Sequence, residues 1–324
     1  MQAVVSKPIP TIFLQVFKPG TNTLTVSATA TADEGQSSPT RICLEGTSGE
    51  YLNMSNGSSI SAPNCGVTVD SSGSNAIGMV GGTSLSAQTF GTVSSTWDNS
   101  GNISGGSSIA SSTKIVQGIT TSCGPAMPTA PTYGTCRADP GGTSTSFTAG
   151  PSSSSGTICY QSLTLVSNNT SDTLNPGTYV ITGYLTFNSG TGGHSNLGGN
   201  GVFFYLTGTA SLTIQNSANV NLVAGGLQTS GGATAPTVGN YSGILFYQAA
   251  SDTQAVTVDG GSNAYMQGNF YAPSAAVTLN NGTTSTTNGD VVAKTLTMAG
   301  GGKLLSSPGS NLGTLNIGVA KLSQ

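Results

Sequence analysis

From Cys159 onward the sequence is a succession of short strand-like units, and no other feature constrains the fold as strongly. The units are mostly four to six residues long, with Gly, Asn or Ser between them. Within a unit, apolar residues alternate with Thr, Ser or Asn, as in "SLTIQNS" and "AVTVDGG". This is the period-two pattern of a strand that buries one side. Runs such as "GVFFYLTG" (Gly201 to Gly208) add aromatic and β-branched residues, which favour strands.

These units predict an all-β chain folded as a right-handed parallel β-helix (β-solenoid), preceded by an N-terminal extended strand segment. Gly and Asn between units tolerate the left-handed backbone of tight corners. Stacked coils lie about 4.8 Å apart, so each coil pairs with the coils above and below it. Asn216, Asn219 and Asn221 recur at unit ends, where side-chain ladders are expected. An antiparallel β-sandwich is the competing fold, but sandwiches usually use longer strands and more surface charge.

The pattern divides the chain into four segments. Residues 1–40 contain two extended stretches, the first of which holds Pro8 and Pro10 and so is not a helix. Residues 41–116 repeat more loosely and are predicted to form an irregular part of the solenoid. Residues 117–158 are rich in Pro, Gly and Ser and are predicted to be an excursion or linker. Residues 159–324 are predicted to form the regular solenoid.

The chain is almost uncharged, which limits its partners and its compartment. Charged residues are 6 % of the sequence, against about 25 % in an average soluble protein. Eight Lys and Arg offer no basic surface, so nucleic acid is not an expected partner. The composition and five cysteines indicate an extracytoplasmic bacterial protein, either in the periplasm, at the cell surface or secreted. No apolar run of about 18 residues and no signal peptide occur, so we expect a fragment of a longer product.

Residues suited to catalysis are scarce, and the expectation is a protein that is not an enzyme and has no catalytic residues, cofactor or metal site. The only histidine, His194, lies in a Gly-rich loop and is interpreted as an exposed loop residue. Glycoside cleavage needs two carboxylates on one surface. After Gly183 the acids are Asp252, Asp259 and Asp290, with no close pair among them. The "DGGSN" segment at Asp259 is interpreted as a turn rather than a calcium site.

The five cysteines cannot all pair within one chain. Two pairs have a sequence separation close to one coil of a solenoid: Cys43 with Cys65 (65 − 43 = 22) and Cys136 with Cys159 (159 − 136 = 23). We therefore predict the disulfides Cys43–Cys65 and Cys136–Cys159, with Cys123 left over. The alternative pairs Cys123 with Cys136.

Aromatic residues recur in register with the strand units, at "FFY", "FY" and "FY". One interpretation is an inward stack between coils with the tyrosine hydroxyls at the edge, and this one is favoured. The other is a sugar-binding platform of exposed tyrosines. The residues concerned are Phe203, Phe204, Tyr205, Phe246, Tyr247, Phe270 and Tyr271.

Several segments, in their order along the chain, resemble a known family. "LNPGTYVITG" (Leu174 to Gly183), "GVFFYLTG", "GILFYQ" and "GNFYAPSAAVTLNNG" (Gly268 to Gly282) are similar to the C-terminal region of TadG-like proteins. These are pilus-assembly components of the tight-adherence (Flp) system, and "CLEG…NCGVTV" (Cys43 to Val69) also fits their pattern.

The resemblance implies a non-enzymatic structural or adhesion role in pilus assembly or surface attachment. Expected partners are proteins or a cell surface, such as pilus components or polysaccharide. A membrane connection is expected only through an N-terminal anchor, which this sequence lacks. The alternative function is a carbohydrate-active or glycan-binding parallel β-helix protein.

Overall fold

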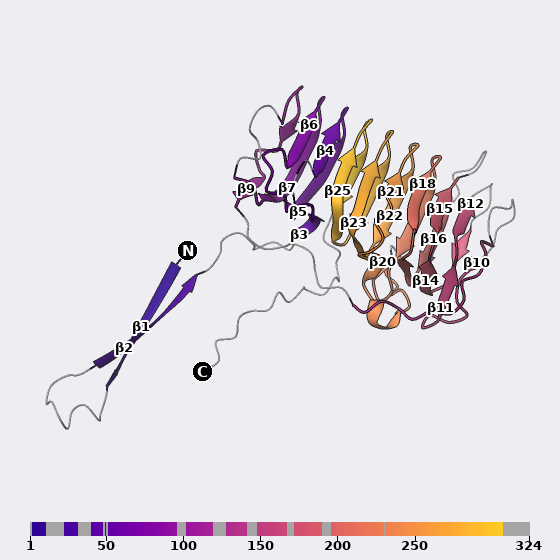
Figure 1. Cartoon of the computed structure of the whole chain (residues 1–324), viewed down its shortest axis with the longest axis horizontal. Helices are drawn as coiled ribbons and strands as arrows, with labels where there is room; N and C mark the ends of the chain where they lie inside the picture. Colours follow the sequence, from indigo (N-terminus) through magenta and orange to yellow (C-terminus); the bar gives the residue numbers. More distant parts are fainter. Residues whose placement is uncertain are drawn as a thin grey trace. The chain divides into compact units, whose positions relative to one another are not determined.

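A computed structural model of the chain describes residues 2–10, 23–31, 40–47, 49, 51–95, 102–118, 128–140, 148–166, 172–189, 196–229 and 231–306. The chain divides into two compact units, residues 1–37 and 38–324 (Figure 1). In the first unit, β1 (Gln2–Pro10) pairs with β2 (Thr23–Thr31) in an antiparallel hairpin, with Gln2 opposite Thr31. The predicted N-terminal strand segment is therefore a two-stranded hairpin.

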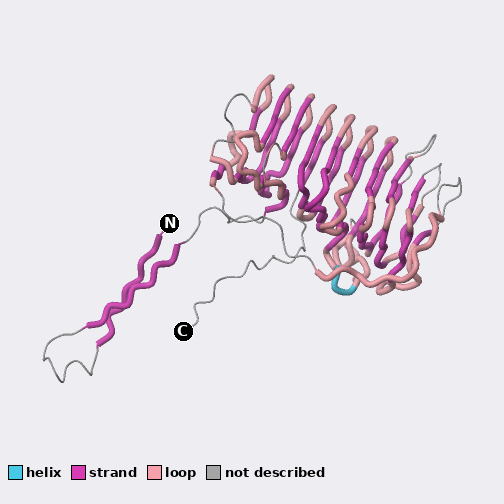
Figure 2. Tube along the Cα trace, in the orientation of Figure 1, coloured by secondary structure: helices cyan, strands magenta, loops and turns pink. Residues whose placement is uncertain are grey.

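The second unit is the predicted parallel β-helix, and its coils form three faces (Figure 2). Four long strands turn a corner and serve two faces each: β5 (Ser59–Val69), β7 (Ser84–Thr92), β23 (Asn269–Leu279) and β25 (Val291–Met298). These four complete the faces formed by the shorter strands. One short 3₁₀ turn, η2 (Gly239–Tyr241), lies between β19 and β20.

The first face contains β11 (Thr157–Tyr160), β14 (Gly177–Ile181), β17 (Val202–Leu206), β20 (Ile244–Gln248), β3 (Thr40–Leu44) and β9 (Lys114–Gln117). The second face contains β12 (Leu163–Val166), β15 (Tyr184–Asn188), β18 (Ser211–Gln215), β21 (Val256–Val258), β4 (Leu52–Ser55) and β6 (Ile77–Val80). The third face contains β10 (Thr148–Ala149), β13 (Thr173–Leu174), β16 (Asn196–Asn200), β19 (Asn219–Val223), β22 (Asn263–Gln267), β24 (Thr284–Asn288), β26 (Lys303–Ser306) and β8 (Ser108–Ile109).

The coils do not stack in the order of the sequence. The stack runs from β10 to β26 and then continues with β3 to β9, because β3 and β4 pair with β25 and β5 pairs with β26. In this junction Val291 lies opposite Ile42 and Met298 opposite Met54. Residues 40–117 thus prolong the solenoid beyond its C-terminal coil, whereas Arg137, later in the sequence, bridges to Tyr160 at the other end of the stack.

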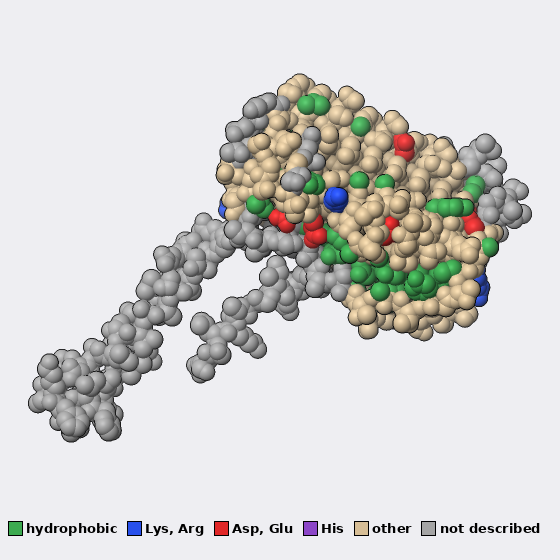
Figure 3. All heavy atoms as spheres, in the orientation of Figure 1, with side chains coloured by type: hydrophobic (Ala, Val, Ile, Leu, Met, Phe, Trp, Pro, Cys, Tyr) green, Lys and Arg blue, Asp and Glu red, His purple; other side chains and the backbone are tan. Residues whose placement is uncertain are grey.

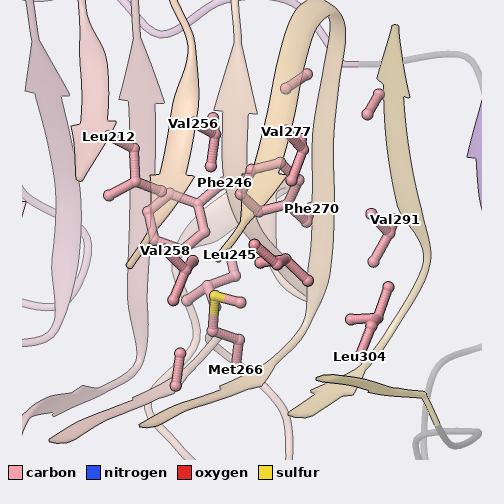
Figure 4. Close-up of a cluster of buried hydrophobic side chains, with 14 of the residues drawn as sticks. Leu212, Leu245, Phe246, Val256, Val258, Met266, Phe270, Val277, Val291 and Leu304 are labelled. Atoms are coloured by element: carbon pink, nitrogen blue, oxygen red, sulfur yellow. The ribbon is translucent and has the colours of Figure 1, made fainter. Parts of the chain in front are cut away.

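The core fills the interior of the stack, because alternate residues of each strand point inward. In β17 and β20 the inward residues include Phe204 and Phe246, which are 0 % and 1 % exposed. Leu212, Val258 and Leu304 come from other faces and pack in the same interior, as Figure 4 shows. Stacking in register places like side chains above one another, so the hydrophobic interior is continuous along the described coils.

One corner of the coil requires a left-handed backbone, and Asn or Gly occupies it. Asn56, Asn216 and Asn281 have φ of 52°, 56° and 53° there. In the adjoining coils Gly260 and Gly300 take the equivalent place, with φ of 67° and 57°. The prediction that Asn and Gly supply the corners is confirmed. Asn216 also donates to Asn188 Oδ1 at 3.1 Å in the neighbouring coil, a contact between asparagines other than the set named from the sequence.

Candidate functional site

A returning segment, residues 128–140, lies against the first coils of the solenoid. Arg137 forms a parallel bridge with Tyr160, donating its N–H to Cys159 O and accepting from Gln161 N–H at 2.9 and 2.8 Å. Asp139 accepts from the N–H and the hydroxyl of Thr164 at 3.1 and 2.7 Å. These bonds satisfy backbone groups that the end of a parallel stack would otherwise leave unpaired.

A disulfide fixes this returning segment to the first face. Cys136 is bonded to Cys159, with their Cα atoms 4.4 Å apart. The bridge of Arg137 with Tyr160 has the same sequence separation as the disulfide (160 − 137 = 23), so Cys136 lies directly opposite Cys159. The 23 residues between the two cysteines therefore equal the length of the coil at this place. The predicted Cys136–Cys159 disulfide, which assumed a separation of one coil, is confirmed.

The predicted Cys43–Cys65 disulfide is wrong. Cys65 is a buried thiol, whereas Cys43 is disulfide-bonded. The residue opposite Cys43 in the next coil is Thr68, so this coil is 25 residues long (68 − 43 = 25). Cys65 is only 22 residues from Cys43 (65 − 43 = 22), and it therefore lies three residues before the position opposite Cys43. Cys65 also belongs to the interior core, while the core neighbours of Cys43 are the inward-facing Ile42 and Leu44 on either side of it. The two sulfurs thus point to opposite sides of the wall. Cys123 lies outside the described residues.

Asp252, the first of the three acids that the sequence analysis considered for catalysis, stabilises a turn. The residue is 1 % exposed, and its carboxylate accepts from the N–H groups of Ala210 and Gln254 at 3.0 and 3.1 Å. Gln248 donates to the carbonyls of Asp252 and Gln254 at 3.3 and 2.9 Å. The carboxylate therefore holds the turn after β20, with its oxygens already engaged.

Asp259 and Asp290 are also separate from one another and from Asp252. Asp259 accepts from Gly260 N–H and from Asn281 Nδ2, both at 2.6 Å, which agrees with its interpretation as a turn residue. Asp290 is 5 % exposed at the start of β25, and its N–H donates to Asn269 Oδ1 at 3.0 Å. His194 lies outside the described residues.

The recurrent aromatic residues separate into an inward and an outward column on the first face. Tyr179, Phe204, Phe246 and Phe270 stack inside, with successive ring centroids 5.2, 5.0 and 5.4 Å apart. This confirms the predicted inward stack for the phenylalanines Phe204, Phe246 and Phe270. Phe203 instead points outward and stacks on Tyr241 at 4.3 Å.

The favoured interpretation also placed the tyrosines of the same strands in the inward stack, and for them it is wrong. They face outward and form what we call the tyrosine column: Tyr205, Tyr247 and Tyr271. The strand register aligns them, and their successive ring centroids are 5.2 and 5.8 Å apart. Tyr205 is 7 % exposed, and the other two are partly buried. Hydrophobic side chains form a band over the region of β20 and β14 in Figure 3.

The hydroxyl groups of this column lie close to one another. Burial raises the pKa of Tyr247, and the neighbouring Tyr205 and Tyr241 raise it further. Burial also raises the pKa of Tyr271, and the nearby Glu45 and Tyr247 raise it further. Tyr241 donates its hydroxyl to Thr129 O of the returning segment at 2.9 Å. Within the described residues, the hydroxyls of Tyr205, Tyr247 and Tyr271 make no hydrogen bond.

Two carboxylates lie beyond the Tyr271 end of the column, and the sequence interpretation missed them. Glu45 and Asp70 follow Leu44 and Val69, which are opposite each other in adjacent coils. Burial raises the pKa of Glu45 and Asp70, and the Asp70 charge raises that of Glu45 further. They are one coil apart in sequence (70 − 45 = 25), a separation that becomes informative once the coil length is known. Lys294 follows Ala293, which aligns with Leu44.

Two kinds of site are not found among the described residues. They contain no group of three or more His, Cys, Asp or Glu side chains that could hold a metal ion. None of their helical segments has the length and hydropathy needed to cross a bilayer.

Fold and surface define the class as a parallel β-helix with a disulfide-fixed returning segment and an aromatic outer face. A family model described as a domain of unknown function (DUF7305) matches residues 148–306. The match begins at the first residue of β10 and ends at the last residue of β26, the part of the stack that is continuous in sequence. Neither the search of curated proteins nor that of solved structures found a match.

Proposed function

We propose that this protein is a non-enzymatic structural or adhesion protein on the extracytoplasmic side of a bacterial cell. Its role is pilus assembly of the tight-adherence type or attachment to a surface. The observation that carries the proposal is the long, regular and almost uncharged stack, which provides extended outer faces on a rigid scaffold. The resemblance of Leu174 to Gly183 and Gly268 to Gly282 to TadG-like proteins supports the pilus-related role.

Two details of the structure support the same proposal. The Cys136–Cys159 disulfide lies on the outer side of the first face, which suits an oxidising compartment. The carboxylate of Asp252 is engaged by backbone N–H groups, and Asp259 stabilises a turn. Carboxylates used in this way are not available for the acid–base pair that glycoside cleavage needs.

Localisation and attachment in the source bacterium test the proposal. An epitope-tagged full-length gene product should appear outside the cytoplasm with Cys136 and Cys159 oxidised, and its deletion should reduce attachment to a surface. Complementation with the intact gene should restore attachment. A reduced protein confined to the cytoplasm would overturn the proposal, as would unchanged attachment in the deletion strain. Release of new reducing ends from a polysaccharide would overturn its non-enzymatic part.

A further inference from the structure

We propose that the tyrosine column binds a neutral, linear polysaccharide chain laid along the outside of the first face. This inference rests on the proposed attachment function and gives the class of ligand that the surface contacts. It concerns Tyr205, Tyr247 and Tyr271, because the flanking Tyr241 already donates its hydroxyl to Thr129 O.

The first argument is the unused hydrogen-bonding capacity of the column. Tyr205 is buried, with 7 % of the residue exposed, yet its hydroxyl makes no hydrogen bond within the described residues. The hydroxyls of Tyr247 and Tyr271 share this property. None of these three hydroxyls is among the fully buried polar atoms that lack a partner, so they lie at the outer edge of the column, where a ligand can reach them. A ligand rich in hydroxyl groups supplies such partners, acting as donor and acceptor.

The second argument is the regular spacing of aromatic surface. Three rings recur at 5.2 and 5.8 Å along the stack, one per coil, on a backbone that parallel pairing holds rigid. Tyrosine combines an apolar ring with a polar tip, and it loses little conformational freedom on binding. A linear polymer whose sugar rings repeat on a similar scale can contact the partly exposed rings of Tyr247 and Tyr271 in turn and reach Tyr205 at its hydroxyl edge. A compact ligand would use only one.

The third argument is charge. Glu45 lies close enough to Tyr271 to raise its pKa, and Asp70 lies beside Glu45. Among the side chains that the structure describes, this end holds the two carboxylates, and Lys294 follows Ala293 in the strand alongside Leu44. A polyanionic chain would meet like charge there, which disfavours binding. A neutral chain meets carboxylate oxygens that can accept hydrogen bonds from its hydroxyls.

Binding of defined oligosaccharides to the purified full-length chain tests the proposal. Isothermal titration with the neutral probes cellohexaose and N-acetylchitohexaose should show binding of at least one, and an acidic galacturonate hexamer should bind more weakly. Tyr247→Ala should weaken binding roughly tenfold. Tyr205→Phe keeps the ring and removes only the hydroxyl, so it should weaken binding without lowering the unfolding midpoint. Tyr184→Ala is the matched control, because Tyr184 is 48 % exposed on the second face.

Three outcomes would overturn the inference. The first is absence of binding to both neutral probes, and the second is preference for the acidic hexamer. The third is binding that Tyr247→Ala and Tyr271→Ala leave intact in folded protein. Failure of these titrations while the intact protein still supports surface attachment rejects the glycan ligand and leaves the attachment function standing. Glycan binding by a protein confined to the cytoplasm would reject the attachment function instead.

Discussion

Replacing Phe246 by alanine should destabilise the solenoid far more than replacing its neighbour, Tyr247. Phe246 is 1 % exposed and lies between Phe204 and Phe270, at ring distances of 5.0 and 5.4 Å. Truncating a buried phenylalanine costs about 3–5 kcal/mol, and loss of two aromatic contacts places this site in the upper half of that range. Tyr247 points outward and is partly exposed, so Tyr247→Ala should cost about 1–2 kcal/mol.

Urea unfolding followed by circular dichroism measures both changes in the free energy of unfolding, with the slope of the transition checked for each variant. Because each coil contacts only its neighbours, limited proteolysis should also place the new cleavage sites of Phe246→Ala in adjoining coils. Phe246→Leu is a milder change that keeps apolar volume in the stack and should fall between the other two variants. If Tyr247→Ala lowered the free energy of unfolding as much as Phe246→Ala, or more, Phe246 could not be the inward-facing residue of β20 and Tyr247 the outward-facing one.

Three further predictions concern the disulfide, the carboxylate pair and a corner. Cys136→Ser with Cys159→Ser should lower the free energy of unfolding by about 3 kcal/mol, from the loss of loop closure between the two positions, and urea unfolding under non-reducing conditions measures this loss. The folded state raises the pKa of Asp70 and so binds its proton more tightly than the unfolded chain does; the stability it contributes is present below about pH 4 and is lost as the pH rises through the raised value. Asp70→Asn should therefore raise the thermal midpoint at pH 7 and change it little at pH 4, and an equal gain at both pH values would contradict this. Gly260→Ala should cost more than about 1 kcal/mol, because φ is 67° and the new Cβ would lie 2.9 Å from Asn216 N; a thermal midpoint equal to that of the native chain would show that the corner tolerates a side chain.

The alternation of facing along each strand follows from local sequence, although the favoured interpretation placed Phe203 and the three tyrosines inside with the other aromatic residues. Adjacent residues of a strand point to opposite sides, so in the "FFY" and "FY" units the phenylalanine next to the tyrosine faces inward and the tyrosine faces outward wherever their register is kept. Phe204 and Tyr205 follow this rule, as do Phe270 and Tyr271. The turn positions could also be predicted from the sequence, because Asn and Gly are the residues that accept the left-handed corner conformation.

The candidate site was less accessible to sequence analysis, because its parts come from distant coils. Asp70 lies beside Glu45 only because the coil between them sets Val69 opposite Leu44, and no local pattern reveals the length of that coil. The same length explains the wrong cysteine pair. A coil as short as the separation of the two cysteines would bring Cys65 opposite Cys43, whereas the actual coil places Thr68 there and leaves Cys65 facing the core.

What the sequence by itself determined is the kind of fold: short alternating units with Asn and Gly corners and few charges favour burial of their apolar sides by coiling and stacking. What only the tertiary structure decided is the order of the coils. Every coil presents a similar row of backbone donors and acceptors at its edge, so backbone pairing alone does not specify the neighbour. Side-chain fit across the junction, such as Met298 on Met54 and Val291 on Ile42, joins residues 40–117 to the end of the 148–306 segment. Such contacts between residues far apart in the chain exist only once the coils are assembled.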